Sequence, residues 1–219
     1  MKVHKQPLKT RPVVSCSGSL LHPLGVWLDT VLQPIATTLP SFIASSYDLK
    51  EALNDIPSLP NNALLFTADA VSMYTNINTY YAINTIKNFL QTQEQFKNQP
   101  LPAILDAIDI IMNNNVFQFG DCYFHQRTGT AMCTPPACCY ATIYYAVKEH
   151  SLLRKYKDNL IFYRRYIDDV FGIWTPTNPN LTFEDFTRDL SFHKLRWEVQ
   201  NPSNQVVFLD MTLTIHNNR

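Results

Sequence analysis

Tyr166-Ile167-Asp168-Asp169 is the stretch that decides the fold, because two adjacent carboxylates stand between two strand-like runs. The preceding run, 160–166, is aromatic and β-branched, and the following run, 170–174, has the same character and stops before Thr175-Pro176. Two such runs around Asp-Asp predict a β-hairpin with both acids at its tip. Paired carboxylates repel one another unless a cation lies between them, and Mg2+ prefers oxygen ligands. The alternative interpretation is a solvated acidic turn, since Asp is common in turns.

A second acidic position, Asp69, lies near the end of another short apolar run, 64–71. A buried strand accommodates a carboxylate only when it is paired, hydrogen-bonded or bound to metal. One acid from this strand and two from the hairpin would make a ligand set for two Mg2+ ions, which can clamp the attacking and leaving oxygens of a phosphoryl transfer. We therefore expect Asp69, Asp168 and Asp169 to be catalytic residues and metal ligands that meet in one cleft.

Five stretches, in order along the chain, resemble the motifs of reverse transcriptases, in the form found in Penelope-like retroelements. Thr67-Ala68-Asp69-Ala70, within 66–77, resembles motif A, and Tyr166-Ile167-Asp168-Asp169 resembles motif C. The other similar stretches are the fingers segment (2–5 with 11–15), motif B (126–135) and the strand after motif D that holds the primer end (208–213). Five blocks in the right order are more specific than any one of them.

The resemblance implies an α+β fold, namely a polymerase palm with an antiparallel sheet and helices on one face, plus partial fingers. Residues 1–62 would form a partial fingers segment and 63–219 the palm, with a fingers insertion at about 94–128 and no thumb. The implied function is that of an RNA-directed DNA polymerase, which transfers nucleotides from dNTPs to a primer 3′-hydroxyl with two Mg2+ ions, or Mn2+ in their place. Its partners would be an RNA template, a DNA primer and the rest of a larger polyprotein, including a thumb and a candidate endonuclease domain. Its location would be intracellular, in the nucleus.

The resemblance also implies nucleotide-binding residues. Arg11 and Lys2 match basic residues that hold the incoming triphosphate, where a guanidinium binds bidentately and an ammonium acts as a point charge. Tyr74 matches the aromatic residue under the incoming sugar that excludes a ribose 2′-hydroxyl; its alternative role is that of a core aromatic. Met132 would pack beside the templating base pair, and the Ala70 carbonyl would complete the shell of one metal ion.

Motif B departs from the family pattern at Cys133, where the family generally has glycine. Glycine lets the backbone approach the base pair and adopt dihedrals closed to other residues. Cys133, which we still assign to the nucleotide site, therefore raises the alternative of a catalytically impaired domain that binds nucleic acid. The palm of an RNA-dependent RNA polymerase is another alternative, which Tyr74 disfavours because an RNA synthesiser must admit the 2′-hydroxyl. His193 or Lys194, in the motif D region, is a loose match for a proton donor to pyrophosphate.

The composition agrees with a globular domain and does not by itself indicate a polymerase. The 18 basic residues balance 18 acidic ones, whereas stand-alone nucleic-acid binders are usually basic. Basic residues nonetheless cluster in the first eleven positions, which suits a phosphate-facing arm or a frayed terminus. Five cysteines without a CxxC pair indicate neither zinc nor a disulfide framework, and no apolar run reaches membrane-spanning length, so we expect no membrane partner. Because the chain starts inside one resembled block and stops just after another, we expect a fragment of a longer protein.

Periodicity and turn signals predict a mixture of helices and strands. A helical run over 20–35 is expected to be broken at Pro23 and ended by Pro34. A glycine-led hairpin is expected over 116–125, and a final hairpin is expected to pair 195–199 with 206–215. A capping box at Asp48 and Glu51 predicts a short helix that runs to Asp55. The other expected helices, with apolar periodicity or an opening proline, cover 78–93, 102–113 and 134–157.

Overall fold

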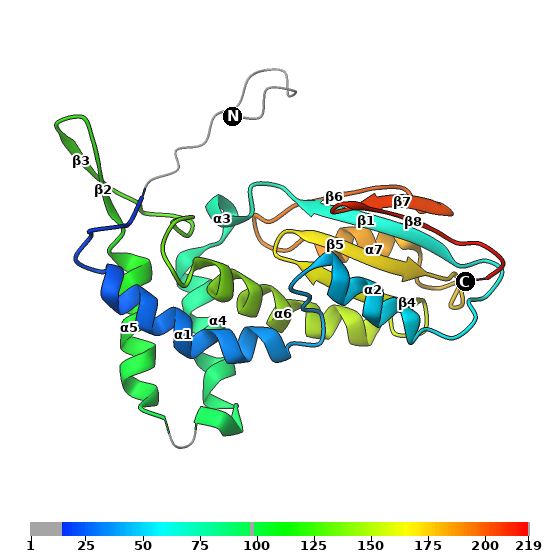
Figure 1. Cartoon of the computed structure of the whole chain (residues 1–219), viewed down its shortest axis with the longest axis horizontal. Helices are drawn as coiled ribbons and strands as arrows, with labels where there is room; N and C mark the ends of the chain where they lie inside the picture. The colour runs from blue at the N-terminus through cyan, green and yellow to red at the C-terminus, as the bar shows by residue number, and fades with distance from the viewer. Residues whose placement is uncertain (1–14, 97–98, 219) are drawn as a thin grey trace.

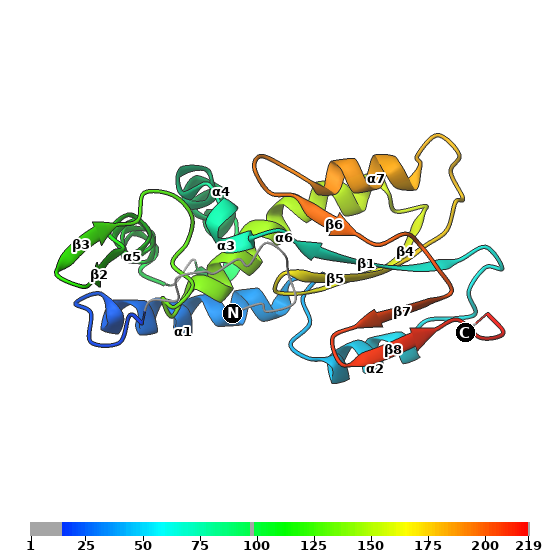
Figure 2. The same cartoon turned by 90° about the horizontal axis from the view of Figure 1, so that it is seen from above.

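The computed structural model describes residues 15–96 and 99–218, which form one antiparallel sheet, two further hairpins and a group of packed helices (Figures 1 and 2). The helices are α1 (His22–Thr38), α2 (Ser46–Asn54), α3 (Met73–Asn76), α4 (Thr79–Gln91), α5 (Leu101–Asn113), α6 (Ala137–Lys155) and α7 (Phe183–Leu190). The strands are β1 (Leu64–Ala70), β2 (Val116–Phe119), β3 (Cys122–His125), β4 (Leu160–Tyr166), β5 (Asp169–Trp174), β6 (Trp197–Val199), β7 (Gln205–Phe208) and β8 (Met211–Thr214). The expected α+β fold with an antiparallel sheet is confirmed.

The main sheet has the strand order β4-β5-β1-β6, and all of its pairings are antiparallel. The β4–β5 hairpin is the one predicted around Asp168 and Asp169, with Tyr166 paired to Asp169 at its tip. Ile167 has a φ of +51°, the left-handed conformation that a tight turn requires. The hairpin places β5 beside β1, so the two acidic segments of the sequence become neighbours.

The two faces of this sheet are covered by different elements (Figure 2). Side chains alternate along a strand, so Phe66 and Ala68 of β1 belong to one core, which α6 and α7 complete, while Leu65 belongs to the other. The second core includes Leu49 of α2 and Phe208 of β7, so α2 and the β7–β8 hairpin cover the face opposite α6 and α7. Two separate cores hold the sheet in place, and at the tip of the β4–β5 hairpin Ile167 packs against the first core and Tyr166 against the second.

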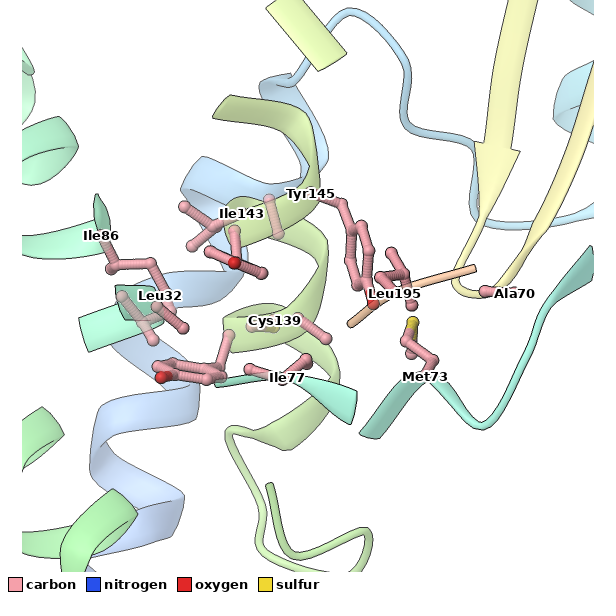
Figure 3. Close-up of a cluster of buried hydrophobic side chains, with 14 of the residues drawn as sticks. Leu32, Ala70, Met73, Ile77, Ile86, Cys139, Ile143, Tyr145 and Leu195 are labelled. Carbon is pink, nitrogen blue, oxygen red and sulfur yellow. The ribbon is translucent and has the colours of Figure 1, made fainter. Parts of the chain in front are cut away.

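Helix α6 is the central helix of the molecule and contacts α1, α4 and α7. From Cys139 to Ala146 every side chain of this helix is buried, which is typical of a helix inside a core. Figure 3 shows Ile143 of α6 pointing towards Leu32 and Ile86, and Tyr145 pointing towards Leu195. Helix α6 therefore connects the helical part of the chain to the sheet.

Two proline expectations for the first helix are wrong. Helix α1 runs from His22 to Thr38, so Pro23 lies in its first turn, where the missing N–H has no intrahelical partner to lose. Pro34 lies inside the helix and does not end it. Its ring is exposed, while Ile35 and Ala36 beyond it are buried in the main core. Packing of the buried stripe outweighs the lost hydrogen bond, so tertiary contacts override the proline signal.

The expected pairing of 195–199 with 206–215 is also wrong. Strand β6 pairs with β1, and β7 instead pairs with β8 around a turn at Leu209, which has a φ of +52°. Strand β6 extends the main sheet at the edge of β1, where three of its residues pair with Ala68, Asp69 and Ala70. Helix α7 was not predicted, although Thr182 and Asp185 form the reciprocal capping box that marks its start.

Most of the other local predictions agree with the structure, although Ser45 rather than Asp48 caps α2. Asn78 caps α4 by accepting a hydrogen bond from the Tyr81 N–H, α5 starts beside Pro102, and the β2–β3 hairpin covers 116–125. Helix α1 contributes to the main core and α2 to the second core. The division into fingers at 1–62 and palm at 63–219 stays a prediction. Within the described residues no helix is long and apolar enough to cross a membrane.

Candidate active site

Asp69 and Asp169 lie directly opposite one another on β1 and β5. In an antiparallel pair the Cβ atoms of opposed residues are about 4.5–5.5 Å apart on the same face of the sheet. The backbone also joins the two segments, because the Ala70 N–H donates to the Asp168 carbonyl at 2.9 Å. The structure therefore brings together the acids that the sequence predicted, with Asp168 as the next residue at the tip of the hairpin.

The opposed acids belong to a longer row across the sheet. Pairing places Tyr166 opposite Asp169 and Glu198 opposite Asp69, so the order across the four strands is Tyr166, Asp169, Asp69 and Glu198. Glu198 is exposed on the edge strand β6. Sequence reasoning missed Glu198 because nothing local shows that β6 pairs with β1.

The donors at this position are all oxygens, which suits a hard divalent cation such as Mg2+. Among residues 15–96 and 99–218, no three His, Cys, Asp or Glu side chains are grouped so as to hold a metal ion. The geometry thus fixes the backbones of Asp69, Asp168 and Asp169 as neighbours, while their carboxylates do not form a complete ligand shell on their own. The magnesium pair and the role of the Ala70 carbonyl stay predictions.

Tyr74 lies on α3, which follows β1 after a single left-handed residue, Ser72, with a φ of +52°. Its hydroxyl is 3.2 Å from the Cys138 thiol at the start of α6. Burial raises the pKa of Tyr74, and its interaction with Cys138 and the negative charge of Asp168 raise it further, so the phenol is neutral at physiological pH. Tyr74 is half-buried, and its contact with the nucleotide sugar stays a prediction.

Residues 126–135, which we call the motif B loop, pack against α3 through the backbone of the loop. The Thr130 N–H donates to the Tyr74 carbonyl at 2.7 Å, and Gly129 adopts a φ of +80°. The φ of Cys133 is not positive, so an ordinary residue can adopt this backbone conformation. The Cys133 carbonyl accepts a hydrogen bond from the Cys16 thiol. The glycine requirement of this loop therefore falls on Gly129, and Cys133 carries no left-handed strain.

Replacing Gly129 with alanine is expected to destabilise the protein. A Cβ there would lie 2.7 Å from the Tyr74 carbonyl oxygen and 2.8 Å from the Thr75 Cα. Overpacking of this kind lowers the free energy of unfolding by about 1–3 kcal/mol, in addition to the left-handed backbone penalty. Urea denaturation measures the loss. Gly120→Ala is the matched control, since Gly120 has a φ of +60° but nothing within 4 Å of its Cβ position. Equal losses in the two variants would contradict the close approach.

A cavity of about 990 Å3 adjoins the motif B loop. Its walls come from the start of α1, the end of α5, the β2–β3 hairpin and the loop, and they include Ser72, Thr75 and Met132. Met132 is exposed and Cys133 is half-buried, so the two predicted nucleotide-site residues differ in access. None of the acids of the row lines this cavity.

Of the remaining predicted site residues, two have no described contact with the acids and two lie outside the described residues. His193 stacks on Tyr81 with ring centroids 5.0 Å apart, and Lys194 is exposed. Neither residue has a described contact with the acidic segments. Lys2 and Arg11 lie outside the described residues, so their assignment to the triphosphate stays a prediction.

Solved structures share this fold. No protein-family model and no curated protein matches the sequence. The chain is similar to a telomerase from Candida albicans, solved with a fragment of telomeric RNA, with a TM-score of 0.68 and 13% identity over 91% of this chain and 37% of that chain. It is similar to an apo telomerase from Candida tropicalis, with a TM-score of 0.64 and 12% identity over 91% of this chain and 40% of that chain. It is also similar to the RNA polymerase complex inside a double-stranded RNA virus, with a TM-score of 0.62 and 14% identity over 89% of this chain and 19% of that chain. At these identities the likeness establishes the fold, and the chain spans well under half the length of each of these proteins.

Proposed function

We propose that this chain is the palm and partial fingers of an RNA-directed DNA polymerase, which transfers a nucleotide from a dNTP to a primer 3′-hydroxyl. The observation that carries the proposal is the opposition of Asp69 and Asp169 on adjacent strands, with Asp168 joined through its carbonyl to Ala70. The fold, which the chain shares with telomerase and a viral RNA polymerase, supports it. Carboxylates on one face of a sheet suit a reaction in which charge neutralisation and positioning do most of the work.

Asp69, Asp168, Asp169 and the Ala70 carbonyl would hold two Mg2+ ions, or Mn2+, which when bound activate the primer hydroxyl and neutralise the leaving pyrophosphate. The protein's own contribution is the sheet, which keeps Asp69 and Asp169 paired so that little reorganisation is needed on binding. The half-exposed position of Asp69 and Asp168 leaves room for a phosphate beside them.

The nucleotide would lie between the acidic row and the motif B loop. Tyr74 would contact its sugar, Met132 and Cys133 its base, and Lys2 with Arg11 its triphosphate. The described hydrogen bond between Tyr74 and Cys138 supports this by fixing the phenol ring relative to α6. The proposed partners are an RNA template and a DNA primer, with a Penelope-like retroelement as the source and a nuclear polyprotein as the context.

Primer extension on an RNA template, with dNTPs and with rNTPs, tests the proposal. The wild-type chain, extended by a thumb, should incorporate dNTPs in preference to rNTPs, and Asp168→Ala should remove incorporation. Preferential use of rNTPs would instead favour an RNA-dependent RNA polymerase, the second candidate, which the likeness to the viral polymerase complex supports. No incorporation by wild type together with recovery in Cys133→Gly would favour the impaired domain, although Cys133 carries no left-handed strain.

Tyr74→Ala is expected to increase ribonucleotide incorporation relative to deoxyribonucleotide incorporation. A pocket that clashes with one methylene-sized substrate group discriminates by about 1–3 kcal/mol, or roughly 10- to 200-fold, so removing the phenol should lose discrimination of that order. Competition between dNTP and rNTP in single-turnover extension measures the ratio. Tyr74→Phe is the matched control, because it keeps the ring and loses only the contact with Cys138. Unchanged discrimination in Tyr74→Ala would remove the assignment.

A further inference from the structure

A buried ion pair lies under the hairpin that carries the acids. Arg165 is 1% exposed and Glu149 is 3% exposed, and the Arg165 Nε lies 2.7 Å from the Glu149 Oε1. The Glu149 carboxylate also accepts hydrogen bonds from the Ser41 hydroxyl at 2.8 Å and from the Tyr163 hydroxyl at 2.6 Å. Burial lowers the pKa of Arg165, but the charge and hydrogen bonds of Glu149 more than offset this, so the guanidinium stays charged.

The same guanidinium reaches the catalytic turn. Its Nη1 donates to the Ile167 carbonyl at 2.9 Å, and its Nη2 donates to the Thr142 carbonyl on α6 at 3.0 Å. Ile167 is the left-handed residue between Tyr166 and Asp168, so this bond is made to the peptide that leads into the acids. One planar group therefore ties the turn to α6, in three directions that its fork geometry can satisfy at once.

The backbone of Arg165 is fixed as well. Its N–H donates to the Ser41 carbonyl at 2.6 Å, and its carbonyl accepts from the Ile43 N–H at 3.2 Å. The segment between α1 and α2 thus holds β4 from the outer edge of the sheet. Asp168 and Asp169 would repel each other and Asp69 at the tip of the hairpin. Two contacts hold this tip: the Arg165 side chain bonds to the Ile167 carbonyl, and the segment between α1 and α2 bonds to the Arg165 backbone.

We propose that Arg165, oriented by Glu149, is a positioning residue that sets the conformation of the Ile167–Asp168 turn and so the arrangement of the acids for divalent metal. This inference rests on the proposed function. A hydrophobic pair of similar volume would often stabilise a core as well as or better than a buried ion pair. Unlike a hydrophobic pair, the ion pair supplies an N–H donor to the Ile167 carbonyl in the turn. Groups that hydrogen-bond to metal ligands orient those ligands in a similar way.

The test compares variants that keep or lose the bond to Ile167. Arg165→Met combined with Glu149→Gln removes that bond without leaving an unpaired buried charge, and the amide can retain the contacts with Ser41 and Tyr163. Arg165→Lys keeps the positive charge beside Glu149 but loses the fork. Tyr163→Phe is the matched control, because it removes a hydrogen bond from the same buried network and leaves the bond to the turn in place.

Mn2+ binding to each folded variant, followed by the loss of the free-ion electron paramagnetic resonance signal, is the first measurement. We expect the double variant and Arg165→Lys to bind Mn2+ about 10- to 100-fold more weakly than wild type, and Tyr163→Phe to bind as wild type does. Primer extension should then show a raised Mn2+ requirement and a lower kcat with an unchanged KM for the template–primer duplex.

The outcomes separate this inference from the proposed function. A weaker Mn2+ affinity in the Arg165 variants supports the positioning role even if the wild-type chain extends no primer, in which case only the polymerase proposal fails. Equal Mn2+ affinity in the Arg165 variants and Tyr163→Phe would overturn the positioning role. So would a wild-type chain that binds no Mn2+.

Discussion

Asp69→Asn is expected to cause a severe but measurable loss of nucleotide incorporation while the fold stays intact. The substitution keeps the size of the side chain on β1 and removes one negative charge from the proposed metal site. A divalent ion contributes several kcal/mol to transition-state stabilisation, and each 1.36 kcal/mol is a factor of ten, so incorporation should fall by about three orders of magnitude. Single-turnover primer extension at saturating Mg2+ measures the loss.

The same variant should unfold no more easily than wild type. Asp69 lies directly opposite Asp169, and like charges in that position destabilise a strand pair by about 0.2–1 kcal/mol. Removing one of them is therefore expected to raise the free energy of unfolding slightly, as is common when a functional residue is replaced. Asp109→Asn on α5, whose carboxylate pairs with Lys87, is the control and should keep its incorporation rate. A fully active Asp69→Asn variant would end the catalytic assignment.

Glu149→Ala is expected to cause the largest loss of stability of any single substitution proposed for this chain. It leaves the guanidinium of Arg165 buried and without its carboxylate, and it also removes the acceptor for Ser41 and Tyr163. Breaking a buried ion pair by removing one partner costs about 3–5 kcal/mol. Urea denaturation, followed by far-ultraviolet circular dichroism, measures the free energy of unfolding.

An exposed acid provides the control for this prediction. Glu51 lies on the exposed side of α2, and Glu51→Ala should change the free energy of unfolding by no more than about 0.5 kcal/mol. A loss below 1 kcal/mol in Glu149→Ala, close to that of the control, would mean that water reaches Arg165 and replaces the carboxylate. The Arg165 network would then not be rigid enough to hold the catalytic turn.

Turn and capping signals in the sequence predicted the parts of the structure that depend only on neighbouring residues. The strand-like runs around Asp168 and Asp169 predicted the β4–β5 hairpin, and Asn78 predicted the start of α4, because turn and capping preferences act over a few residues. The resemblance to reverse transcriptases, with motifs in order, led to the same fold that the comparisons support. It also assigned Tyr74 to the proposed site; burial is the main cause of the raised pKa of Tyr74, and the charge of Asp168 adds to it.

The sequence by itself determined the strands on either side of Asp168 and Asp169, the position of Asp69 near the end of β1, and where α4 and α5 begin. Only the tertiary structure decided that β6 pairs with β1, which adds Glu198 to the acidic row, that α1 continues through Pro34, and that Gly129 rather than Cys133 must be glycine. It also decided that Ser41 and Glu149 meet Arg165 beneath the turn. The physical reason is that local conformation follows from propensities of adjacent residues, whereas edge pairing, burial and close backbone approach depend on which distant surfaces meet when the cores form.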